Sequence, residues 1–120
     1  MTKLAKKRFD APDETRPIAK GKVEVVKFEE VQVMRTTFEP GWRWSESVKP
    51  IVKTDSCQVH HIGYVISGRM VVRMDDGSTA ELGPGDVGVI PPGHDAWIVG
   101  DVPCVMLDFG GAAVYAKPPS

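Results

Sequence analysis

Long hydrophobic runs are missing from this sequence. The longest uncharged apolar stretches, such as VGVIPP at residues 87–92, are far shorter than the roughly 20 residues that cross a bilayer as a helix. The first ten residues, MTKLAKKRFD, contain no apolar segment of the kind found in secretory signals. We therefore expect a cytoplasmic protein with no membrane partner.

Cysteine and histidine are scarce, with two and three copies in 120 residues. Cys57 and Cys104 match no zinc-binding spacing, and without an export signal we expect free thiols rather than a disulfide. The histidines are His60, His61 and His94. Any imidazole chemistry must come from these three side chains.

A basic excess is also absent, since the formal net charge is −1. Residues 1–20 hold six basic and three acidic side chains, which leaves nine basic and thirteen acidic side chains for the rest. A nucleic-acid-binding groove needs a basic surface on the folded part. We expect no nucleic-acid partner, and we interpret residues 1–20, which are charged and interrupted by proline, as an extended N-terminal arm.

No segment has a convincing helical period, whereas glycine and proline are plentiful at 12 and 10 residues. A chain of this length forms one domain. Short β-branched or alternating runs separated by turn residues predict an all-β sandwich or barrel. The predicted strands lie at residues 22–29, 31–38, 59–68, 69–74, 79–82, 87–90, 94–100, 103–109 and 112–116, and a long loop with few strand signals spans 39–58.

The stretch HHIGYVISGRMVVRMDDGSTAELGPGDVGVIPPGH, residues 60–94, resembles the core of the cupin family. Cupin motifs place glycines, histidines, a glutamate and a Pro-x-Gly turn at fixed spacings, and the turn residues match at Gly41, Gly68, Gly85, Asp86, Pro91 and Gly93. The similarity covers residues 36–110. It implies a double-stranded β-helix, or jelly-roll barrel, over residues 21–117, preceded by the arm at 1–20, which is flexible or exchanged in a dimer.

This sequence departs from the cupin motifs at the positions of the metal ligands. His61 stands where the family places glutamate, and Cys57 or Ser56, with Asp55 or Thr54 two residues earlier, stands where it places paired histidines. The second motif's histidine position is Ala96, and His94 lies two residues before it. The alternation of a strand puts His94 and Ala96 on one face, and the resemblance puts His61 inside the barrel.

These substitutions leave two alternatives open. Cys57, His61 and His94 suit zinc, iron or copper by ligand type, and manganese is a further divalent metal to consider; water, Asp55 or Gln58 would complete the shell. Alternatively, the same side chains line a metal-free pocket and hydrogen-bond a small ligand.

Further residues are candidates for binding a small molecule. The set is Trp42, Arg43, Trp44, Gln58 and Trp97. Arg69, Arg73 and Glu46 are either contacts to a charged substrate or surface residues. We expect His60 to face away from the pocket and Cys104 to be a small core residue.

The chain is most similar in pattern to small stand-alone bacterial cupins, and this similarity implies architecture more than activity. One hypothesis is a protein that binds or senses a small metabolite. The other is a metal-dependent oxygenase, isomerase or lyase acting on a small organic acid or sugar derivative, with His61 and His94 as catalytic groups. The resemblance also implies a homodimer, formed by packing sheet faces, with Tyr64 in the contact, or by exchanging terminal strands.

Overall fold

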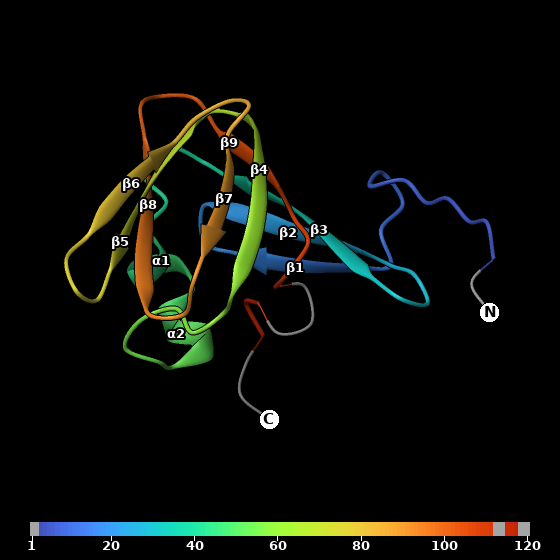
Figure 1. The fold of residues 1–120 in the computed structure, drawn as a ribbon, viewed down its shortest axis with the longest axis horizontal. Coiled ribbons are helices and arrows are strands. Elements are labelled where there is room, and N and C mark those ends of the chain that lie inside the picture. Colours follow the sequence, from blue (N-terminus) through green and yellow to red (C-terminus); the bar gives the residue numbers. More distant parts are fainter. Residues whose placement is uncertain (1–2, 112–114, 118–120) are drawn as a thin grey trace.

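The computed structural model describes residues 3–111 and 115–117 and shows a two-sheet β-structure (Figure 1). A six-stranded antiparallel sheet has the order β1-β2-β3-β9-β4-β7, and a three-stranded antiparallel sheet has the order β6-β5-β8. The strands are β1 (Glu14–Ile18), β2 (Gly21–Lys27), β3 (Gln32–Phe38), β4 (His61–Ser67), β5 (Arg69–Met74), β6 (Thr79–Leu82), β7 (Val87–Ile90), β8 (His94–Val99) and β9 (Cys104–Asp108).

The arrangement confirms the all-β jelly-roll barrel. Consecutive β4 and β5 lie in different sheets, as do β6 and β7, and β8 and β9, so the chain crosses between the sheets repeatedly. Turn residues allow these crossings. Gly68, between β4 and β5, has φ +79° and lies so close to Pro103 that a Cβ would come within 2.3 Å of its carbonyl oxygen. A side chain is therefore excluded at this position.

Alternation along the strands decides what faces the barrel interior. On β4, His61, Gly63 and Val65 are buried, while Ile62 and Tyr64 on the other face are exposed. On β8, His94, Ala96 and Ile98 are buried, and on β9 the buried residues are Cys104, Met106 and Asp108. Two histidines and one carboxylate thus lie on the inward faces of these three strands, which places polar chemistry in the core.

Two short helices occupy the long segment for which no helix was expected. Helix α1 spans Trp44–Ser47 and α2 spans Lys49–Val52. Each has one turn, which is too short to leave a helical period in the sequence. Trp44 and Val48 are buried in the core, so the segment closes one end of the barrel between β3 and β4. No helix in the described part of the chain is long and apolar enough to cross a membrane.

The N-terminal arm is shorter than the expected range, residues 1–20. Strand β1 begins at Glu14 and pairs with β2 of the same chain from Glu14↔Val25 to Ile18↔Gly21. Proline did not exclude a strand here, because Pro17 lies in an edge strand, where a missing backbone N–H does not break the sheet. Residues 3–13 contain no strand and extend away from the barrel (Figure 1).

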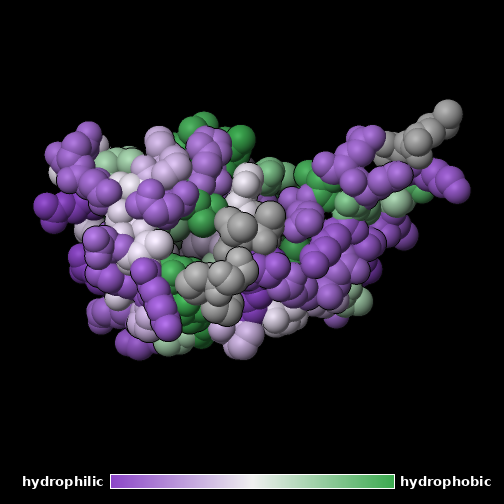
Figure 2. Space-filling model, turned by 90° about the horizontal axis from the view of Figure 1, so that it is seen from below, coloured by the Kyte–Doolittle hydropathy of each residue, from purple (hydrophilic) through white to green (hydrophobic). Residues whose placement is uncertain are grey.

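Most predicted strands agree with the structure within one or two residues, and those at 69–74, 79–82 and 87–90 agree in full. The closing strand predicted at 112–116 lies largely outside the described residues, although Tyr115 and Ala116 form a turn and are buried. Seen from the side of α2 and the C-terminal segment, the surface is mainly hydrophilic, with smaller hydrophobic groups between (Figure 2).

Candidate metal centre and adjoining cavity

Cys57 and His94 are brought together by the backbone. The two residues form an isolated antiparallel bridge, in which the Cys57 N–H donates to the His94 carbonyl oxygen at 2.7 Å and the His94 N–H donates back at 3.2 Å. The Gly93 N–H also donates to the Cys57 carbonyl oxygen at 2.7 Å. Gly93 has φ +93°, and this turn starts β8 with His94 facing inward.

His61 joins this pair from β4, where it is paired with Ile90 of β7. Its Nε2 lies 3.7 Å from the Cys57 Sγ, and its ring centroid lies 5.3 Å from that of His94. One ligand atom from each of Cys57, His61 and His94 lies within 4.8 Å of the others, and all three residues are buried. The structure thus assembles the three predicted metal ligands in one place.

Both histidines are oriented through their second ring nitrogen. The His61 Nδ1 donates to a carboxylate oxygen of Asp108, and the His94 Nδ1 donates to the Pro91 carbonyl oxygen at 2.8 Å. An imidazole whose Nδ1 donates has Nε2 as its remaining site for a metal or a proton. Carboxylate and carbonyl partners of this kind accompany metal-binding histidines in many proteins.

Asp108 is itself fixed by the chain that follows it. The backbone N–H groups of Gly110 and Gly111 donate to its Oδ1 at 2.8 and 3.1 Å. Gly111 leaves little room for any other residue, since a Cβ there would lie 2.9 Å from the His61 Nδ1. The Gly-Gly bend after β9 therefore supports both the carboxylate and the histidine that it holds.

Burial and hydrogen bonding act in opposite directions on the charges of this cluster. Burial alone raises the pKa of Cys57, but its hydrogen bonds to His61 and His94 and their positive charge lower the pKa to about 6. Burial alone lowers the pKa of His61, but Asp108 and Cys57 raise that pKa to about 9. Burial alone raises the pKa of Asp108, but the hydrogen bond and charge of His61 lower it. Without a metal, a thiolate and an imidazolium are thus paired near neutral pH.

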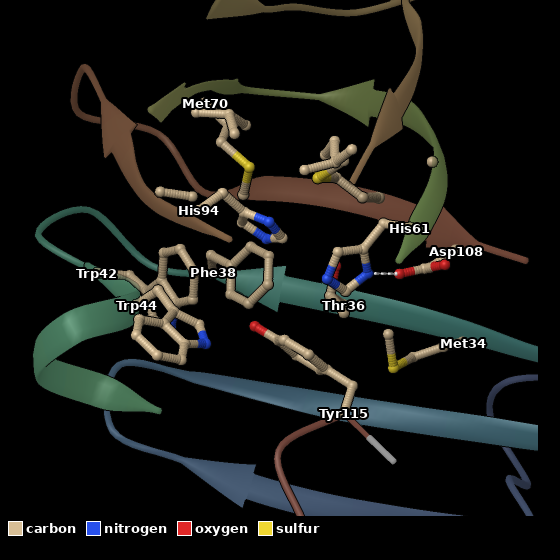
Figure 3. A pocket seen from close by; sticks show the side chains of 15 residues that line it. Met34, Thr36, Phe38, Trp42, Trp44, His61, Met70, His94, Asp108 and Tyr115 are labelled. Atoms are coloured by element: carbon tan, nitrogen blue, oxygen red, sulfur yellow. Dashed lines mark hydrogen bonds and ion pairs between the residues drawn. The ribbon is translucent and has the colours of Figure 1, made fainter. Parts of the chain in front are cut away.

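A cavity of about 40 Å³ lies beside His61 and His94 in the barrel interior. Most of its wall is apolar, and the polar side chains among its described lining residues are Thr36, Trp42, Trp44, His61, His94, Asp108 and Tyr115. Figure 3 shows the two tryptophans at one end and Met34 with Asp108 at the other. A volume of this size holds about three water-sized groups.

Tyr115 covers the cavity from the C-terminal segment. Its ring packs edge-on against His61, with centroids 5.2 Å apart, and its hydroxyl is directed toward the interior (Figure 3). Burial and the negative charges of Cys57 and Asp108 raise the pKa of Tyr115. Arg16 of β1, also buried, donates from Nη1 to the Tyr115 carbonyl oxygen at 2.8 Å. The first strand therefore helps to fix the residue that covers the site.

The predicted ligand-binding residues divide into two groups. Trp42 and Trp44 line the cavity, whereas Arg43 between them faces outward. The Arg43 guanidinium lies 4.5 Å from the Trp97 ring and its Nε lies 3.3 Å from Asp95. Neither Arg43 nor Trp97 is among the residues that line the cavity. Arg43 was predicted to bind a ligand together with Trp42 and Trp44. Because neighbouring residues in an extended chain face opposite ways, its side chain lies away from the cavity that the two tryptophans line.

The remaining candidates lie further from the centre. Gln58 is exposed, hydrogen-bonds Ser56 and lines an outer hollow of about 190 Å³ together with Cys57, Trp44 and Tyr115. Asp55 and His60 are exposed. Cys104 is fully buried in the core, and burial raises its pKa to about 11.

Two residues of the site were not assigned a role from the sequence. Asp108 shares its strand face with Cys104 and Met106, and this alternation was the available signal for an inward carboxylate. Nothing local marked Tyr115 or its contact with Arg16, which are 99 residues apart in the chain. Such contacts depend on the tertiary fold rather than on spacing.

Residues 51–110, half of the chain, match the family model described as the cupin domain. The chain belongs to the cupin family. In the described part of this cupin the three side chains that could hold a metal ion are Cys57, His61 and His94. A comparison with curated protein sequences gives no match.

Solved structures show the same fold. The cupin is similar to a sugar phosphate isomerase of Silicibacter pomeroyi, at a TM-score of 0.62 and 20% identity, covering 89% of this chain and 75% of that one. It is similar to a Rhizobium leguminosarum protein of unknown function, at 0.60 and 17%, covering 91% and 98%. It also matches Bacillus subtilis oxalate decarboxylase, which has Mn(II) centres, at 0.53 and 28%, covering 81% and 27%. The cupin spans less than a third of the oxalate decarboxylase chains that it matches.

Proposed function

We propose that this protein is a metal-dependent cupin, in which Cys57, His61 and His94 hold a transition metal beside a cavity for a small molecule. The observation that carries this proposal is the convergence of the three ligand atoms within 4.8 Å in a buried position. The orientation of both histidines through Nδ1 supports it, because each Nε2 is the ring nitrogen left to bind a metal.

The donor set favours some metals over others. One thiolate and two imidazoles suit zinc, iron and copper, whereas manganese prefers oxygen ligands. Three protein ligands leave a coordination position for water or a substrate, as in catalytic rather than structural zinc sites. A metal in such a site polarises a bound oxygen atom or activates a water molecule. In this proposal His61 and His94 are therefore metal ligands. We infer that the reaction is that of an isomerase, a lyase or an oxygenase.

A metal-free binding protein is the second candidate, and one observation favours it. Cys57, His61 and Asp108 already form a hydrogen-bonded chain, so the buried thiol and imidazole have partners without a metal. In this reading the same cavity binds and reports a small metabolite, and His61 and His94 are hydrogen-bonding groups.

Elemental analysis of untagged protein grown with added zinc, iron, manganese and copper distinguishes the two candidates. We expect about one metal ion per chain in the wild type, and its loss in His61→Ala and in His94→Ala. The matched control is His60→Ala, which changes the exposed neighbouring histidine and leaves the metal content unchanged. A metal-free wild type, or metal lost equally in His60→Ala, contradicts the metal-dependent proposal.

We further propose that the protein is a cytoplasmic homodimer. Exposed apolar residues on the outer face of β4 and β7 support a contact between identical sheet faces, and they include Ile62, Tyr64, Val87 and Val89. Exchange of residues 3–13 between protomers remains the alternative form of dimer. A monomeric mass by light scattering contradicts both forms, and a Tyr64→Lys variant that stays dimeric contradicts the sheet-face contact.

A further inference from the structure

Trp42 and Trp44 each carry a buried hydrogen-bond donor with no acceptor. Both residues are 1% exposed, and each indole Nε1 is a buried side-chain nitrogen without a partner in the described part of the chain. An N–H removed from water usually finds an acceptor in a folded protein. Two such groups on residues that line one cavity indicate that a bound molecule supplies the acceptors.

Both indoles are packed in the hydrophobic core. The Trp42 ring stacks on Phe38, with centroids 3.9 Å apart, and its carbonyl oxygen accepts from the Ile98 N–H at 3.1 Å. Trp44 is the first residue of α1. Donors that are already in place lose little freedom when a ligand binds.

The rest of the cavity wall restricts the ligand's chemistry. An indole donates and does not accept, so the ligand must present acceptor atoms to it. Asp108, a carboxylate in the wall, already accepts from His61, Gly110 and Gly111. Most other described lining residues are apolar, including Met34, Met70 and Met106. A ligand with many hydroxyl groups is therefore poorly matched to this wall.

Size restricts it further, since about 40 Å³ holds about three or four non-hydrogen atoms. No lysine or arginine is among the described lining residues. His61, which also lines the cavity, already hydrogen-bonds Asp108 and Cys57. The positive charge for an anion therefore comes from the metal centre, and on this point the inference rests on the proposed function. Hydrogen bonds to a charged acceptor are stronger than those to a neutral one.

We propose that the indole N–H groups of Trp42 and Trp44 form a donor subsite for the oxygen atoms of a compact carboxylate of one or two carbons. The subsite selects by acceptor charge and by size. Arg43, between the two tryptophans in the chain, takes no part because it lies over Trp97 on the outer side.

The indole N–H signals of ¹⁵N-labelled, zinc-supplemented protein report this subsite directly. Sodium acetate is the probe, acetamide is its neutral analogue, and sodium chloride at equal concentration controls for ionic strength. We expect acetate to move the Trp42 and Trp44 signals in a saturable manner. The Trp97 signal, from a half-buried residue outside the cavity, serves as the internal control and stays in place.

Variants that keep an aromatic ring but remove the N–H test each donor. We expect Trp42→Phe and Trp44→Phe each to weaken acetate binding roughly tenfold or more, and Trp97→Phe to leave it unchanged. Acetamide binding as tightly as acetate overturns the inference, as does an acetate effect that is unsaturable or equal on all three signals. Two unchanged affinities in the Phe variants also overturn it.

Metal content measured on the same samples separates this inference from the proposed function. Saturable Trp42 and Trp44 shifts in protein that holds no metal support the donor subsite, but they contradict the metal centre and its part in binding the anion. A metal-loaded protein whose indole signals do not respond to acetate overturns the donor subsite and leaves the metal centre supported.

Discussion

Asp108 accepts a hydrogen bond from the Nδ1 of His61, although the two residues lie 47 positions apart in the sequence. The strands that carry them, β9 and β4, are neighbours in the six-stranded sheet. This contact decides which nitrogen of His61 faces Cys57 and which proton the imidazole keeps. Several properties of the centre follow from it.

Removing the charge of Asp108 weakens the metal centre. We expect Asp108→Asn to lower metal affinity by roughly 10–100-fold, the usual effect of losing a carboxylate behind a ligating histidine. Competition with a chromophoric chelator measures the affinity. Asp101→Asn, at an exposed aspartate, is the matched control. Equal affinities for Asp108→Asn and wild type would show that His61 is oriented without Asp108.

The same variant changes how the metal-free protein responds to pH. The folded-state pKa of His61 is raised to about 9, above its ordinary value of 6.5. Its contribution to stability is therefore fully present below pH 6.5 and is lost as the pH rises through 9. We expect denaturation by urea to show this loss in wild type and a smaller loss in Asp108→Asn, where Cys57 alone still raises the pKa of His61. Identical pH profiles for the two proteins would contradict the assignment.

Cys57, although only 2% exposed, is expected to react slowly with iodoacetamide in the metal-free protein, because it lines the outer hollow and its pKa is lowered to about 6. The rate should level off above pH 7 and fall roughly tenfold per pH unit below 6. Cys104 should not react, since it is fully buried and its pKa is raised to about 11. Mass spectrometry of peptides identifies the modified residue. Modification of Cys57 that continues unchanged after metal loading would contradict its role as a ligand.

Arg16 links the first strand to the site through Tyr115. We expect Arg16→Gln to lower the free energy of unfolding by about 1–3 kcal/mol, because the buried hydrogen bond to the Tyr115 carbonyl and the ion pair with Glu14 are both lost. Arg8→Gln, whose guanidinium forms an exposed ion pair with Asp10, should change it by less than about 0.5 kcal/mol. Chemical denaturation compares the two. Equal effects would mean that Arg16 does not anchor Tyr115.

Gly68 and Gly77 test the crossing between the two sheets. Both have positive φ, but a Cβ at Gly68 meets the Pro103 carbonyl oxygen at 2.3 Å, whereas nothing lies within 4 Å at Gly77. We expect Gly77→Ala to cost about 1 kcal/mol for its backbone conformation alone, and Gly68→Ala to cost clearly more. Thermal unfolding measures both. A Gly68→Ala protein as stable as Gly77→Ala would refute the close approach.

The turn pattern of residues 60–94 predicted the barrel because glycine and proline occupy positions where geometry permits few other residues. The resemblance to cupins placed His61 inside the barrel, and alternation placed His94 on the same strand face as Ala96, since strand neighbours point in opposite directions. Helices α1 and α2 were not predicted because one turn leaves no period. The contact of Asp108 with His61 and that of Tyr115 with Arg16 were not predicted either, because each joins distant parts of the chain.

X-ray absorption spectroscopy of the metal-loaded protein identifies the atoms bound to the metal and so tests whether Cys57, His61 and His94 are its ligands. We expect one sulfur at about 2.3 Å and two imidazole nitrogens at about 2.0–2.1 Å for zinc, with the sulfur absent in Cys57→Ser and retained in Cys104→Ser. A shell of nitrogen and oxygen alone in the wild type would contradict this expectation.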